Sequence, residues 1–307
     1  MISESATSPV NLTRVPATEE LQRLLASALA RRETVFPSLH GDKLLTSRQY
    51  WHADYFGLYR SNIFQQATPS QQATIVQLAN FELLQEIYWL ETIGVNYMAK
   101  MVNWAETTQH KAIYTLFNAE AVYHRTQIMP FLTHYQIGGI NRDFWCLLGN
   151  LLDSEEKIPL LFIFQVVLKG WSLSHYQNLS QQCQDLDLAK VLTSFLPEQS
   201  RHQITGITLF RQTTLSESSI NEIVKVLTLM LKIIQTRSSM VIRVMMRVLS
   251  DLSSYQQKQL FTELEIEHCN RYLLDQFRTL VAKEKSGTIV EMLEKKGAFN
   301  TLITHHC

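Results

Sequence analysis

Glycine and proline are scarce in this chain, and their scarcity limits the folds that it can adopt. Only 10 glycines and 7 prolines occur in 307 residues. β-Sandwiches and dinucleotide-binding folds need frequent tight turns, which these two residues commonly supply. No segment of adequate length alternates apolar and polar residues with the period of two that marks a half-buried strand. We therefore expect an all-α protein built from long helices.

We expect these helices to form one large domain. Hydrophobic residues make up 46% of the chain, which is enough to bury a sizeable core. The start of the chain has the composition of a disordered tail, over 1–15, and a single helical domain is expected over 16–300. Within it, we expect leading helices over 16–67, a central group of four helices over 68–215 and C-terminal helices over 216–300.

Capping and turn residues mark the expected helix boundaries. Thr68-Pro69-Ser70-Gln71 places Pro at the first helical position inside a Thr-x-x-Gln capping box, and so predicts the start of a long helix. The leading helices are expected over 17–32 and 47–65. The four central helices are expected over 68–104, 107–135, 157–183 and 188–209, with a short helix over 141–152 between the second and the third. A further helix begins at 216–219, and the last two cover 253–283 and 288–296.

Charge and composition exclude several classes of partner. The 28 Lys and Arg residues balance the 28 Asp and Glu residues, so the basic footprint of a nucleic-acid-binding protein is missing. The first 16 residues lack an apolar core of signal-peptide length, and the most apolar run, 158–168, is too short to span a bilayer. The four cysteines show no CxxC spacing and are expected to be reduced thiols. These features favour a cytoplasmic protein without a membrane span.

Two pairs of residues repeat along the central helices. Glu120 and His124 are four positions apart and so share a helix face, and Glu198 and His202 have the same spacing. Each member of the second pair follows its counterpart by 78 positions. Glu91 lies 29 positions before the first Glu of the pairs, and Lys169 lies 29 positions before the second. The chain therefore contains two helical hairpins of equal size, each with one inward group followed by a Glu/His pair.

This arrangement is typical of a helix bundle that holds two metal ions, in which carboxylates and Glu/His pairs project from the four helices. Carboxylate oxygens and imidazole nitrogens suit iron or manganese. Such ions can activate dioxygen, which protein side chains alone cannot do. The candidate metal ligands are Glu91, Glu120, His124, Glu198 and His202.

Four segments resemble the ferritin-like superfamily of diiron-carboxylate four-helix bundles, and in particular uncharacterised cyanobacterial ferritin-like proteins. The segments are 91–101, 118–124, 168–176 and 198–202, within a region that covers about half the chain. The resemblance implies a ferritin-like bundle over 68–215 with extra N- and C-terminal helices. It also implies a Glu on the first and third helices and Glu-x-x-His on the second and fourth. Iron storage is not expected, because storage cages use shorter subunits.

The chain departs from this family pattern at three positions. When the histidines are aligned, Ala121 and Gln199 stand where the glutamates of Glu-x-x-His belong, so Glu120 and Glu198 are one residue early. Lys169 stands at the carboxylate position of the third helix. A protonated lysine cannot bind a metal ion, and its natural partner is Glu91. A buried pair of these two residues would occupy the space that the metal ions fill in the family.

Two functional hypotheses follow. The first is an iron- or manganese-dependent oxidoreductase that activates dioxygen to oxidise a small apolar substrate. The alternative is a metal-free binding or assembly module, which forms a homodimer, in which Lys169 replaces a metal-ligand carboxylate. A third hypothesis, radical or self-modifying chemistry at Lys169 beside Tyr or Trp, has no specific signal in the sequence.

Overall fold

A computed structural model describes most of the chain, and its regular elements are helices. The described residues are 19–20, 23–24, 49–132, 142–237, 240–250, 252–282 and 286–301. No strand occurs within these ranges, which confirms the all-α expectation. The expected tail over 1–15 and most of the expected helix over 17–32 lie outside the described residues.

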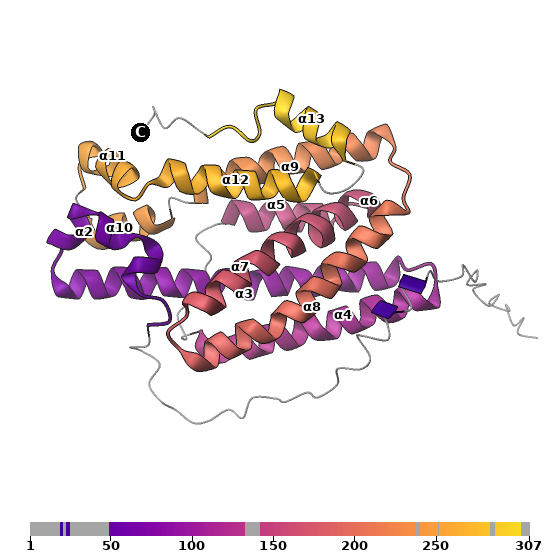
Figure 1. The fold of residues 1–307 in the computed structure, drawn as a ribbon, viewed down its shortest axis with the longest axis horizontal. Coiled ribbons are helices and arrows are strands. Elements are labelled where there is room, and N and C mark those ends of the chain that lie inside the picture. The colour runs from indigo at the N-terminus through magenta and orange to yellow at the C-terminus, as the bar shows by residue number, and fades with distance from the viewer. Residues whose placement is uncertain are drawn as a thin grey trace, which may run out of the picture.

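Four long helices lie side by side through the molecule (Figure 1). They are α3 (Pro69–Asn103), α4 (Thr108–Ile128), the continuous helix of α6 (Lys157–Leu160), η5 (Leu161–Leu168) and α7 (Lys169–Gln182), and finally α8 (Leu186–Arg211). α3 packs along α4, α8 packs along η5 and α7, and α4 contacts α8. We refer to these as the central helices. Every candidate ligand named above lies on one of them.

The predicted cap of α3 is confirmed. The Gln71 backbone N–H donates to Thr68 Oγ1 at 3.3 Å, and the Thr68 backbone N–H donates to Gln71 Oε1 at 3.0 Å. α4 ends at Ile128, earlier than the expected 135, and a single 3₁₀ turn follows as η4 (Met129–Phe131). Pro130 lies in this turn, and because proline has no backbone N–H it cannot continue the helical hydrogen bonds.

Two expected helices are broken into shorter elements. The prediction of one helix over 47–65 is wrong, because the described part of that segment, from 49 onwards, forms η2 (Ala53–Phe56), η3 (Leu58–Arg60) and α2 (Asn62–Gln66). Gly57 separates the first two with a φ of +66°, a left-handed conformation that ends a helical run. The expected helix over 253–283 is divided into α11 (Ser254–Glu263) and α12 (Ile266–Ala282). Glu265, with a φ of +49°, lies at that break.

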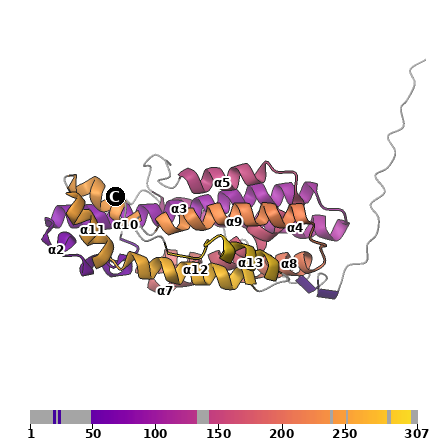
Figure 2. The same ribbon diagram turned by 90° about the horizontal axis from the view of Figure 1, so that it is seen from above.

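The remaining helices cover the central ones. They are α5 (Arg142–Leu152), α9 (Glu217–Arg237), α10 (Met240–Leu249) and α13 (Gly287–Lys295). α5 and α9 pack together, and α12 contacts η5 and α7 (Figure 2). α10 packs on α3, at the end of the molecule that also holds α2 and α11. η5 therefore has helices around it and lies deep in the protein.

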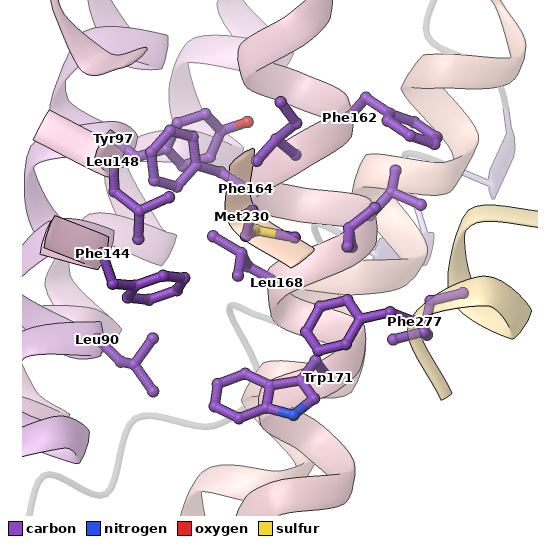
Figure 3. Packing of buried hydrophobic residues seen from close by; sticks show 14 of the residues in the cluster. Leu90, Tyr97, Phe144, Leu148, Phe162, Phe164, Leu168, Trp171, Met230 and Phe277 are labelled. Atoms are coloured by element: carbon purple, nitrogen blue, oxygen red, sulfur yellow. The ribbon is translucent and has the colours of Figure 1, made fainter. Parts of the chain in front are cut away.

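η5 lies at the centre of the apolar core. All eight of its residues are buried, and their neighbours include side chains of α3, α5, α9 and α12 (Figure 3). Tyr97 of α3 stacks on Phe164 of η5 with ring centroids 5.0 Å apart. By length and composition alone the helix Lys157–Gln182 could cross a membrane, but 78% of its most apolar window is buried inside the protein. This is the pattern of a core helix, so among the described residues there is no clear membrane span. η5 is π-helical, a geometry that the sequence did not predict.

The close packing of η5 against α8 predicts the effect of a substitution at Gly206. A Cβ atom at Gly206 would lie 2.6 Å from Gln165 Cγ and 3.0 Å from the Gln165 backbone carbon. We expect Gly206→Ala to reduce the free energy of unfolding by about 1–3 kcal/mol through overpacking. Gly149→Ala is the matched control, because it lies in helix α5 with no atom within 4 Å of the new Cβ. It should raise stability by about 0.5–1 kcal/mol in urea denaturation. Equal effects at the two positions would contradict the packing described here.

Candidate functional site in the buried polar core

Glu91 lies at the centre of a polar network between the central helices. Its side chain is almost fully buried, and its Oε1 accepts hydrogen bonds from the Tyr176 hydroxyl at 2.8 Å and from Gln199 Nε2 at 2.9 Å. Its Oε2 lies 3.2 Å from His124 Nδ1 and 3.9 Å from Lys169 Nζ. Both carboxylate oxygens therefore already face groups from the other three central helices.

The two Glu/His pairs exchange partners between α4 and α8. Glu120 Oε2 lies 2.7 Å from His202 Nε2, and Glu198 Oε2 lies 3.5 Å from His124 Nε2. Each histidine thus meets the glutamate of the other helix. Arg201 joins the two pairs, because its NH2 group lies 2.6 Å from Glu120 Oε1 and 3.8 Å from Glu198 Oε1.

The charged groups of the network shift one another's pKa values. Burial alone would raise the pKa of Glu91, but Lys169 and the hydrogen bonds from His124 and Tyr176 hold the pKa at about 2. Burial also opposes the charge of His124, yet the carboxylates of Glu198 and Glu91 outweigh it and raise the His124 pKa above its ordinary 6.5. The network therefore favours an ionised Glu91 beside a protonated His124.

The pKa values of the second pair, Glu120 and His202, are shifted in a different way. Burial would raise the pKa of Glu120, but His202 and Arg201 lower it. Burial lowers the pKa of His202 to about 4, more than its bond to Glu120 can raise it, and Lys169 acts in the same direction as burial. His202 is therefore favoured as the neutral imidazole, in contrast to His124.

Apolar rings and a second polar group enclose the network. The Phe195 ring stacks on His124, and the Phe117 ring packs on His202, each with centroids 4.0 Å apart. One layer further along the helices, Gln165 Oε1 of η5 accepts hydrogen bonds from the hydroxyls of Tyr97 at 2.9 Å and Tyr114 at 3.1 Å. Gln165 Nε2 in turn donates to the His202 carbonyl oxygen at 2.9 Å. The candidate site thus belongs to a longer column of polar contacts inside an apolar core.

The structure brings all five candidate ligands and Lys169 into this network, but their depths differ. Ala121 and Gln199, at the Glu positions of the family pattern, have no exposed surface. Glu120 and Glu198, one residue earlier, each keep 19% of the side chain exposed between α4 and α8. On α4 and α8 the positions that face the core are therefore those of Ala121 and Gln199. The side chains of Glu120 and Glu198 reach the core from its edge.

The side chains as they are packed do not fit a two-metal site. Among the described residues, no group of three or more His, Cys, Asp or Glu side chains is arranged to hold a metal ion. Glu91, the deepest carboxylate, is held by three hydrogen-bonding side chains and faces the ammonium of Lys169. A divalent cation would have to displace these donors and would be repelled by the lysine charge.

Several residues of the network were not predicted as site residues. Arg201 directly precedes His202 and lies three positions after Glu198 on the same helix. This spacing could have predicted that Arg201 belongs to the network. Gln165 gave no such signal, because it lies in an apolar run. The other carboxylates of α3 lie outside the network. Glu86 Oε1 lies 3.4 Å from His175 Nε2, and burial raises the pKa of Glu82 to about 7 against the opposing charges of two arginines on α10.

Removing the Tyr176 hydroxyl tests whether Glu91 depends on its hydrogen-bond donors. Tyr176→Phe deletes a hydrogen bond to a buried carboxylate, so we expect the free energy of unfolding to fall by about 2 kcal/mol. Tyr255→Phe is the matched control at a side chain that is 77% exposed, and it should change stability by less than about 0.5 kcal/mol. Urea denaturation of both variants provides the comparison, and a neutral Tyr176→Phe would show that the hydroxyl does not support Glu91.

The low pKa of Glu91 predicts how stability depends on pH. Folding lowers this pKa from 4.5 to about 2, so the ionised carboxylate contributes stability above about pH 4.5 that is lost as the pH falls toward 2. At pH 7 we expect Glu91→Gln to be less stable than wild type by about 3–5 kcal/mol, because the buried cations lose their partner. The difference should shrink as the pH falls from 4.5 toward 2. A difference that stays constant over this range would contradict the assignment of an ionised Glu91.

Comparisons of the chain with protein-family models, with curated proteins and with solved structures found no match. The function of the chain is therefore inferred from its own residues and from the geometry of the polar core.

Proposed function

We propose that this chain is a metal-independent protein of the ferritin-like type, a cytoplasmic binding or assembly module with a four-helix bundle and extra helices. Support for the bundle comes from the four central helices and from the segments that resemble the ferritin-like superfamily. Support for metal independence comes from the polar core, in which protein side chains supply the positive charge that metal ions supply in that superfamily.

One observation carries this proposal. The ammonium of Lys169 lies 3.9 Å from Glu91 Oε2, and both side chains are buried. An ion pair of this kind is expensive to bury, by several kcal/mol for each ion, unless further hydrogen bonds hold the charges. Tyr176, Gln199 and His124 provide these bonds to Glu91. Both oxygens of the Glu91 carboxylate thus already have partners from the protein itself.

A second candidate function is supported by the crossed Glu/His pairs. An iron- or manganese-dependent oxidoreductase acting on a small apolar substrate would use His124, His202 and the three glutamates. The exchange of partners between α4 and α8 keeps these groups together. Against it stand Lys169 and the donors that already occupy Glu91.

The metal content of the purified protein separates the two functions. We expect protein from cells supplemented with iron and manganese to contain far less than one metal ion per chain in elemental analysis. A metal ion bound to the native state would raise the melting temperature, and EDTA would then lower it. We therefore expect the melting temperature to be the same with and without EDTA. One tightly held iron or manganese ion per chain, with a lower melting temperature after EDTA treatment, would overturn the proposal in favour of the oxidoreductase.

A further inference from the structure

His202 has a buried ring nitrogen without a hydrogen-bond partner. Burial keeps this imidazole neutral, and its Nε2 lies 2.7 Å from Glu120 Oε2. Burial opposes the charge of Glu120, but His202 and Arg201 outweigh it, so Glu120 is an ionised carboxylate that only accepts hydrogen bonds. His202 therefore carries its single proton on Nε2, and its Nδ1 is an acceptor. No described residue donates to this Nδ1, although the side chain has no exposed surface.

Thr205, one helical turn after His202 on α8, carries a second unpartnered group. Its buried hydroxyl has no hydrogen-bond partner within the described part of the chain. Residues three positions apart lie on the same helix face, so Thr205 and His202 share one side of α8. Thr208, one turn further, has the ordinary arrangement, because its hydroxyl donates to the Ile204 carbonyl oxygen at 2.9 Å. Two unpaired polar atoms on adjacent turns of one buried helix face are rare.

η5 and α7 run along this part of α8. Gln165 Nε2 donates to the His202 carbonyl oxygen, and a Cβ atom at Gly206 would touch the Gln165 side chain. Lys169 follows Gln165 by four positions, and its positive charge adds to burial in lowering the pKa of His202. The Lys169 ammonium makes no hydrogen bond to a described residue. Three groups with unused hydrogen-bonding capacity therefore lie on facing parts of α7 and α8.

These three groups select the chemistry of a molecule that can bind between them. His202 Nδ1 requires a donor, which excludes an anion that can only accept hydrogen bonds. The charge of Lys169 repels a cation. The molecule must also be small, because the packing around the ammonium is close: a Cβ atom at Gly94 would lie 3.6 Å from Lys169 Nζ. Water is neutral and small, both donates and accepts, and commonly makes about three hydrogen bonds at buried sites.

We propose that one internal water molecule binds between α7 and α8, where it donates hydrogen bonds to His202 Nδ1 and Thr205 Oγ1 and accepts one from the Lys169 ammonium. In the other half of the sequence repeat, a protein group, Glu91, partners His124 Nδ1. Through His202 and Glu120, whose side chain is 19% exposed, the water connects the buried lysine to the protein surface by hydrogen bonds. This water site is additional to the proposed function.

The direction of a stability change tests the water site. Thr205→Val keeps the shape of the side chain and removes its hydroxyl. If that hydroxyl had no partner, the change would remove an unsatisfied buried group and raise the midpoint of urea denaturation. With a bound water the change removes one of its partners, so we expect the midpoint to fall. A midpoint that rises or stays the same would overturn the inference.

Thr208→Val is the matched control, at a buried threonine of the same helix whose hydroxyl already has a partner. The Ile204 carbonyl oxygen keeps its helical hydrogen bond in this variant, so the midpoint should change less than in Thr205→Val. An equal or larger fall for Thr208→Val would show that the loss at Thr205 does not report on water, and would also overturn the inference.

A crystal structure of the wild-type protein tests the position of the water. We expect a water peak within about 3.2 Å of both His202 Nδ1 and Thr205 Oγ1, and its loss in Thr205→Val. A well-ordered His202 without such a peak would overturn the inference and leave the proposed function intact. An anomalous peak of iron or manganese on His202 Nδ1 would overturn the proposed function as well, so the two failures are distinguishable.

Discussion

A single buried charge, that of Glu91, determines how the central helices can be arranged. An ionised carboxylate without partners in an apolar interior is very unfavourable, so it must be neutralised and hydrogen-bonded where it lies. α4 contributes His124, α7 contributes Tyr176 and Lys169, and α8 contributes Gln199. Sliding any of these helices by one turn would move a partner about 5 Å away from the carboxylate. The apolar core supplies most of the driving force for folding, and Glu91 selects one register among many that would bury similar area.

The crossed pairs give the same arrangement a second layer of specificity. Because Glu120 meets His202 and Glu198 meets His124, α4 and α8 hold each other at two points along their length. The two histidines nevertheless differ in charge preference. Burial lowers both pKa values, but the carboxylates of Glu198 and Glu91 outweigh it at His124, whereas at His202 the single carboxylate of Glu120, opposed by Lys169, does not. A repeat that is symmetric in sequence spacing has therefore become asymmetric in electrostatics.

The sequence predicted the elements that carry clear local signals. The capping box of Thr68 and Gln71 located the start of α3, and the repeat of 29 and 78 positions located the polar core. It did not predict the breaks at Gly57 and Glu265, because a turn conformation there depends on how the neighbouring segments pack. The π-helical geometry of η5 could not be predicted either, since a run that is apolar except for Gln165 has no periodicity to reveal it. Which oxygen meets which donor is a property of the packed helices, and so the occupation of Glu91 could only be seen in three dimensions.

The π-helical geometry of η5 determines which face of the following helix lies against Glu91. A π-helical turn holds one residue more than an α-helical turn, so a change of one turn to α geometry would rotate the following helix by about 100° and shift it by about 1.5 Å. Lys169 is the first residue after η5, and such a rotation would carry its ammonium off the face that meets Glu91. The position of a positive charge beside Glu91 therefore depends on the number of residues in η5, as well as on the identity of the residue at 169.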